Sequence, residues 1–142
     1  MAYNTRYIVE DLKEIIKAEN YFSNVSTGKA IPLDQEDVFP SCYIISHTNP
    51  FDFNNRATTG TEGYDSLMMI TLNINLNLGE DSLEYLDVQD MLMRAVLRDT
   101  KIWRYTLDRN IKLATWDFNE RFPKKEGQIT FEFKHRLCDE NC

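Results

Sequence analysis

The sequence predicts an α+β fold: a mainly antiparallel sheet with two helices packed on one face and a long extended hairpin-like strand and loop. One segment alternates apolar and polar residues over more than ten positions, two segments carry apolar residues at helical spacing, and two alternating segments close the chain as a hairpin. Strands therefore outnumber helices and come in runs, which favours antiparallel pairing. With 142 residues, the chain is expected to form a single domain over 1–142 with an ordinary hydrophobic core.

The first element is a predicted helix over residues 5–18, with Thr5 as its cap. Its apolar residues recur at helical spacing: Ile8, Leu12, Ile15 and Ile16. Residues 21–25 are expected to form a short strand before a turn, and residues 31–40, between two prolines, a loop. Residues 41–47 (SCYIISH) are the next predicted strand.

A long polar loop is predicted over residues 48–64. Loops of this length inside compact domains are usually functional or disordered. This loop contains Phe51, Phe53 and Tyr64, which a purely solvating loop does not need.

The clearest pattern is the strict alternation in residues 66–78 (SLMMITLNINLNL), which predicts one long strand with a buried face and a polar face. The buried face is expected to consist of the apolar row: Met68, Ile70, Leu72, Ile74, Leu76 and Leu78. The polar face carries Asn73, Asn75 and Asn77. Asparagine is poor in strands, so we expect this row to be solvated or to face polar groups of another subunit.

A second helix is predicted from Asp81 to about Asp99, because Asp81 and Glu84 have the spacing of a capping box. Its apolar stripe is Tyr85, Val88, Leu92, Ala95 and Val96, and three further residues suggest cover on more than one side: Leu86, Met91 and Met93. Residues 111–118 and 128–137 alternate like the strands of a hairpin, with a turn around 122–127. Residues 137–142 are expected to be a mobile tail.

The charge of the chain is uneven. The net charge of −7 argues against binding driven by phosphate neutralisation. Residues 1–90 contain 5 Lys and Arg against 15 Asp and Glu, whereas residues 91–142 contain 11 against 8. Such asymmetry suits subunits that associate head to tail, although uneven scattering over solvated faces would look the same.

No residue pattern predicts an enzyme, a cofactor site or a metal site. The five glycines form no phosphate-binding loop. Cys42 and His47 are five positions apart and would face opposite sides of a strand, so Cys42 is expected in the core. His135, Cys138 and Cys142 lack a clear fourth metal ligand. Three cysteines fit a reducing compartment, and no apolar run is long enough for a membrane span.

Four predicted elements follow one another along the chain: the opening helix (YIVEDLKEII), the long strand (SLMMITLNINLNL), the second helix (SLEYLDVQDMLMRAVL) and the closing hairpin (IKLATWDF, then QITFEFKHRL). Their order resembles that of phage tail terminator proteins and related tail-completion and neck proteins. The resemblance spans nearly the whole chain. It implies a structural virion protein, made in the host cytoplasm, that forms a homo-oligomeric, sixfold ring. Such a ring terminates the tail tube and joins the tail to the head.

The same resemblance implies several partners: further copies of the chain, the tail tube protein, and the head connector or neck proteins. DNA would pass through the ring without specific binding, and no membrane is involved. The expected subunit-interface residues are Phe51, Phe53, Arg56, Tyr64, Asn73, Asn75 and Asn77. Alternatives are another head–tail joining or tail tube component, or a small acidic inhibitor that mimics DNA. A hydrolase with dispersed carboxylates would need a deep pocket that holds acids with perturbed pKa values.

Overall fold

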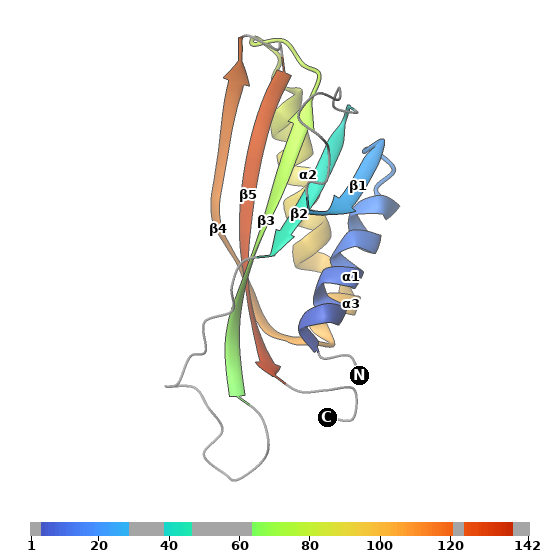
Figure 1. Ribbon diagram of the computed structural model, residues 1–142, viewed down its shortest axis with the longest axis vertical. Helices are drawn as coiled ribbons and strands as arrows, with labels where there is room; N and C mark the ends of the chain where they lie inside the picture. The colour runs from blue at the N-terminus through green and yellow to red at the C-terminus, as the bar shows by residue number, and fades with distance from the viewer. Residues whose placement is uncertain (1–3, 29–38, 47–63, 121–123, 138–142) are drawn as a thin grey trace.

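The structure, a computed structural model, describes residues 4–28, 39–46, 64–120 and 124–137. It is an α+β arrangement of three helices and five strands (Figure 1). In chain order these are α1 (Asn4–Ala18), β1 (Asn24–Thr27), β2 (Ser41–Ser46), β3 (Tyr64–Leu76), α2 (Glu84–Arg98), α3 (Thr100–Trp103), β4 (Thr106–Asn119) and β5 (Lys124–Leu137). The predicted α+β class is therefore confirmed, and α3 is an additional helix that the sequence did not predict.

The five strands form one mixed sheet in the order β1-β2-β3-β5-β4. Only β1 and β2 pair in parallel, and the other three pairings are antiparallel. The longest continuous pairing joins β3 to β5, from Tyr64 opposite Leu137 to Leu76 opposite Lys125. The last strand of the chain thus lies inside the sheet, between β3 and β4, and the prediction of a mainly antiparallel sheet is confirmed.

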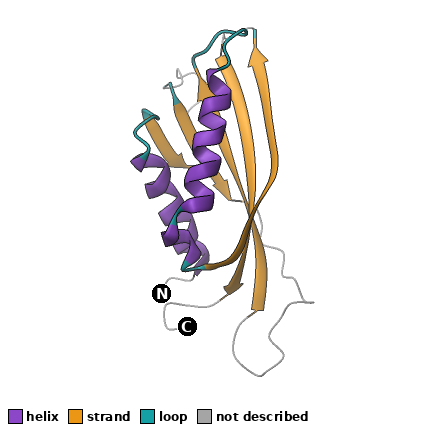
Figure 2. Ribbon diagram, turned by 180° about the vertical axis from the view of Figure 1, so that it is seen from behind, coloured by secondary structure: helices purple, strands orange, loops and turns teal. Residues whose placement is uncertain are grey.

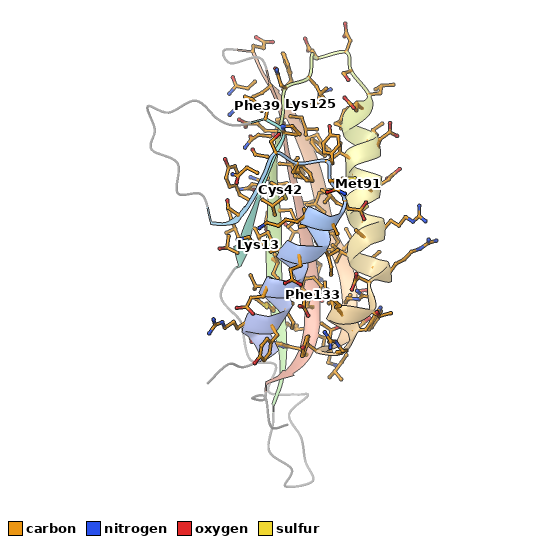
Figure 3. The ribbon with its side chains drawn as sticks, turned by 90° about the vertical axis from the view of Figure 1, so that its right-hand side faces the viewer. Lys13, Phe39, Cys42, Met91, Lys125 and Phe133 are labelled. Carbon is orange, nitrogen blue, oxygen red and sulfur yellow. The ribbon has the colours of Figure 1, made fainter. Side chains whose placement is uncertain are left out.

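The core lies between the helices and the sheet. Figure 2 shows α1 and α2 in front of the sheet, which is seen from its other side in Figure 1. The helices contribute to one apolar cluster: Ile8, Leu12, Ile15, Ile16, Val88, Leu92, Ala95, Val96 and Ile102. The strands complete it with side chains such as Cys42, Ile70, Leu72, Phe131 and Phe133 (Cys42 and Phe133 are labelled in Figure 3). Every apolar residue that the sequence assigned to the first helix stripe is buried.

Several element boundaries differ from the prediction. The first strand begins at Asn24, not at residue 21. Tyr64 belongs to β3, and β3 ends at Leu76, so Asn77 and Leu78 follow the strand. Of the predicted loop (48–64), residues 48–63 lie outside the described residues, as do residues 138–142 of the predicted tail (137–142).

The start of α2 also differs. The helix begins at Glu84 with Leu83 as its N-cap, so the predicted capping box at Asp81 is wrong. The backbone N–H of Glu84 instead donates to the hydroxyl of Ser82 at 3.3 Å. Leu86 is 41% exposed, so α2 is not covered on the side where Leu86 lies.

Lys125 connects β5 to the loop before α2. Its ammonium group donates to the backbone oxygens of Glu80 (3.0 Å) and Ser82 (2.9 Å) and lies 4.1 Å from the centre of the Tyr85 ring. The sequence predicts a turn at this position, but Lys125 lies in β5 and is buried. It is buried because its side chain points toward the helix layer and replaces water as the partner of those carbonyl groups.

Arg109 of β4 caps the other end of α2. Its guanidinium group donates to the carbonyl oxygens of Val96, Leu97 (2.6 Å) and Asp99 (3.1 Å). Its Cζ atom lies 3.8 Å from the centre of the Trp103 ring. The last carbonyl groups of a helix have no partner within the helix, so Arg109 supplies one and also places a positive charge at the negative end of the helix dipole. Burial lowers the pKa of Arg109 to about 10.

Candidate subunit interface

The cysteine and histidine residues that were candidates for catalysis or metal binding are either buried or lie outside the described residues. Cys42 is fully buried, as predicted, and burial raises the pKa of its thiol to about 12, so the thiolate is not formed near neutral pH. His135 is also fully buried, and its Nε2 atom lies 2.9 Å from the Thr5 hydroxyl. Thr5 lies within α1 and is not its cap. His47, Cys138 and Cys142 lie outside the described residues.

Within the described ranges, no group of three or more His, Cys, Asp or Glu side chains could hold a metal ion. Among the helices of the same ranges, none is long and apolar enough to cross a membrane. The sequence also predicts surface residues for contacts between subunits.

Of the seven predicted interface residues, Phe51, Phe53 and Arg56 lie outside the described residues. Tyr64 is the first residue of β3 and pairs with Leu137 of β5.

The asparagine row is divided. Asn77 is exposed, Asn73 is half-buried, and Asn75 is only 6% exposed. The expectation of a solvated row is wrong for Asn75, because β3 is the central strand of the sheet and is flanked by β2 and β5 along this stretch. The Oδ1 atom of Asn73 is buried and has no hydrogen-bond partner among the described residues.

The exposed apolar surface of the sheet lies instead on β4. This strand has 14 residues and lies at the edge of the sheet, so one side of its backbone has no neighbouring strand among the described elements. Leu107 is 52% exposed and Leu113 is 59% exposed. A long edge strand with exposed apolar side chains favours pairing with another chain. We call Leu107, Leu113 and the outer backbone of β4 the β4 edge.

The sequence pattern missed the β4 edge because the strand is irregular. The β4–β5 register shifts between Ile111 and Leu113, so Ile111 opposes buried Phe131 while Leu113 opposes Thr130. Trp116 faces the helices, where its Nε1 donates to Gln89 at 2.9 Å. Strict alternation had placed Ile111 and Leu113 on one face, and the β-bulge separates them. No local signal in the sequence reveals that β4 is an edge strand.

The two edges of the sheet come from different halves of the chain. Strands β1, β2 and β3 come from residues 1–90, which carry the acidic excess, and β5 and β4 come from residues 91–142, which carry the basic excess. The edge strands themselves do not carry this difference, because β1 has no charged residue and β4 has two acidic and two basic residues. They differ in length, with 4 residues in β1 and 14 in β4.

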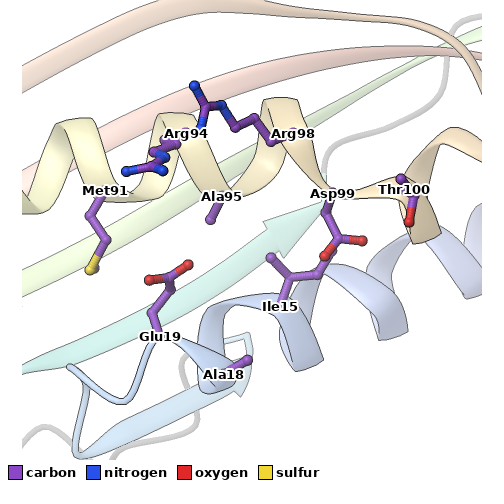
Figure 4. Close-up of a pocket in the computed structure, with 9 residues that line it drawn as sticks. All are labelled: Ile15, Ala18, Glu19, Met91, Arg94, Ala95, Arg98, Asp99 and Thr100. Atoms are coloured by element: carbon purple, nitrogen blue, oxygen red, sulfur yellow. The ribbon is translucent and has the colours of Figure 1, made fainter.

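A second surface feature is a groove of about 690 Å³ between α1 and α2 (Figure 4). Its apolar lining comes from both helices: Ile15, Ala18, Met91 and Ala95. Charged side chains at the groove are Arg94 and Arg98 on α2, Glu19 after α1, and Asp99 after α2. The groove therefore combines an apolar floor with charges of both signs.

No protein-family model matches the chain, and no curated protein matches it. Among solved structures, the chain is similar to a chain in the virion of a native gene transfer agent particle. The two have 7% sequence identity and a TM-score of 0.44, with 92% of each chain covered. At this TM-score the likeness assigns neither a family nor a function.

Proposed function

We propose that this chain is a structural virion protein without catalytic activity. In this proposal it is one subunit of a ring, sixfold by its resemblance, that terminates the tail tube of a phage and joins the tail to the head. The order of helices and strands, which resembles tail terminator and neck proteins, supports this role. DNA would pass through the ring, and the net charge of −7 disfavours its retention.

The observation that carries the proposal is the difference between the two edges of the sheet. A ring needs heterologous contacts, in which two different surfaces of each subunit meet. Strand β4 provides a long edge within the basic half of the chain, and β1 lies at the opposite edge within the acidic half. The two edges differ in length and in side chains, so a contact between β4 of one subunit and β1 of the next would have one defined direction, which is what a closed ring requires.

The β4 edge is the proposed contact surface on one side of each subunit. Leu107 and Leu113 would be covered there by the neighbouring subunit. Asp108, Lys112 and Asp117 lie on the same strand and are charged. Charges along an edge strand oppose unselective pairing, so they would restrict the β4 edge to a partner that satisfies them.

Light scattering with and without assembled tail tube protein tests the proposal. The wild-type chain is expected to form a closed ring, or to assemble only when tubes are added. The double variant Leu107→Lys, Leu113→Lys should keep its fold, since both side chains are more than half exposed, and should lose assembly on tubes.

Leu86→Lys is the matched control, because Leu86 is an exposed leucine of the helix layer and not of the sheet edge. It should assemble like the wild type. A wild-type chain that remains indifferent to tubes at every concentration would refute the ring proposal. The reading as a small acidic inhibitor would then take its place.

A further inference from the structure

We propose that α2 binds the α2 helix of a second copy of this chain in antiparallel orientation. The contact surface is a charged stripe made of Glu84, Asp87, Met91, Arg94 and Arg98. This contact is independent of the ring, which uses the edges of the sheet.

The five residues lie on one side of the helix. They are separated by three, four, three and four positions, which is the spacing of neighbours along a helix surface. From Glu84 to Arg98 the stripe extends for roughly 21 Å at about 1.5 Å per residue. The four charged residues are exposed, and none forms an ion pair with another residue in the described part of the chain. Met91, at the centre, is half-buried.

The order of charges makes the stripe self-complementary in one orientation only. Both acids precede Met91 and both arginines follow it, with Glu84 and Arg98 each seven positions from Met91. When two stripes run antiparallel with Met91 opposite Met91, Glu84 faces the partner's Arg98 and Asp87 faces the partner's Arg94. Two-fold symmetry repeats each pair, so four ion pairs surround one apolar contact. A parallel arrangement would instead place like charges opposite each other.

The helix dipole explains only part of this order. Acids at the start and cations at the end of a helix are stabilising, but the effect decays within the first and last turns. It therefore accounts for Glu84, Asp87 and Arg98 but not for Arg94, which lies more than a turn from the end of α2. Nor does it require the charged side chains to lack partners within the chain.

The groove beside the stripe provides room for the contact. Met91 and Ala95 line it from α2, and Ile15 and Ala18 line it from α1 (Figure 4). Ala18 and Ala95 have small side chains, which allow close approach of a second chain. Glu19 and Asp99 place negative charge beside the arginines, so the groove is not a simple anion site, and the direction of binding comes from the order of charges along α2.

The two-fold contact predicts an even number of subunits. Two-fold contacts through the helices, combined with cyclic contacts through the sheet edges, would join two rings face to face. In the absence of tubes the same contact would hold the free chain as a dimer.

Charge reversal tests the contact. One variant carries Arg94→Glu and Arg98→Glu, and the other carries Glu84→Lys and Asp87→Lys. Each variant alone opposes like charges across the two-fold axis, so its dimer dissociation constant should rise by roughly tenfold or more. An equimolar mixture of the two restores every pair and should recover a heterodimer. Sedimentation equilibrium measures the association, and circular dichroism checks that both variants are folded.

A third variant, Met91→Lys, places a positive charge at the two-fold centre. It should not dimerise, and mixing it with either charge-reversed variant should not restore the dimer. Raising the salt concentration should weaken the wild-type dimer, because the pairs lie at an exposed rim. A wild-type chain that stays monomeric, or reversed variants that keep the wild-type dissociation constant or fail to recover on mixing, would overturn the proposal. Tube assembly by these variants should remain intact, so failure of this contact is distinct from failure of the ring proposal.

Discussion

Replacing Arg109 by alanine is expected to destabilise the fold by about 3 kcal/mol. The side chain is only 5% exposed, and it donates to three carbonyl groups at the end of α2. A charged hydrogen bond contributes about 1.5–3 kcal/mol, and the bond to Val96 is the one in buried surroundings. The positive charge at the helix end and the stacking on Trp103 each add about 0.5–1 kcal/mol. The other two carbonyl groups are partly accessible to water, so their loss adds less.

Urea unfolding followed by circular dichroism measures this loss. Arg109→Lys keeps the charge, but a single ammonium group does not reproduce the planar fork of a guanidinium, so we expect it to recover less than half of the difference. Arg98→Ala is the matched control when unfolding is measured in salt high enough to dissociate the α2 contact, because Arg98 is an exposed arginine of the same helix end and should then change the free energy of unfolding by less than about 0.5 kcal/mol. If Arg109→Ala is as stable as that control, Arg109 does not cap α2 and the account of this helix end is wrong.

Three further substitutions test other parts of the fold. Gly127→Ala would place a Cβ atom 2.4 Å from the Trp116 ring, so we expect a loss of about 1–3 kcal/mol in urea unfolding and a shifted tryptophan emission. Lys125→Met removes the hydrogen-bond donor to the loop before α2 and should lower the free energy of unfolding by about 1–3 kcal/mol. An unchanged urea midpoint would show that Lys125 does not stabilise this loop. Burial raises the pKa of the Cys42 thiol from about 9 in the unfolded chain to about 12 in the folded state. The contribution of the neutral thiol to stability is therefore complete below pH 9 and is lost progressively as the pH rises from 9 toward 12. Wild-type stability should therefore fall between pH 9 and 11 by about 1.4 kcal/mol per pH unit more than that of Cys42→Val, and equal slopes would refute this.

Patterns that depend on neighbours along the chain predicted the structure well. The alternation around Ile70 and Leu72 identified β3, and the helical spacing of Leu12 and Ile16 identified the buried face of α1. Both follow from the fixed geometry of strands and helices. Gly127 shows the limit of such reasoning: it was assigned to a turn, whereas it lies in β5 opposite Trp116, where any side chain would collide with the indole ring.

The surface features depended on the strand order, which no local pattern contains. Asn75 was expected to be solvated and is buried, because β3 became a central strand. Leu113 was placed in an ordinary alternation and is exposed, because β4 became an edge strand with a bulge. Arg109 reaches carbonyl groups 10 to 13 positions earlier in the chain only because β4 turns back along α2.

The position of β5 has a consequence for the synthesis of this chain. Helix α1 is made well before β5, yet Thr5 of α1 hydrogen-bonds to His135 of β5, 130 residues later, and β5 also separates β3 from β4. Until β5 leaves the ribosome, β3 lacks its β5 partner and α1 lacks the apolar side chains that β5 supplies. The sheet therefore cannot be completed before β5 has been made, since segments far apart in the chain must meet before the core is complete. A nascent or truncated chain that stops before β5 would be a target for chaperones, proteases or aggregation.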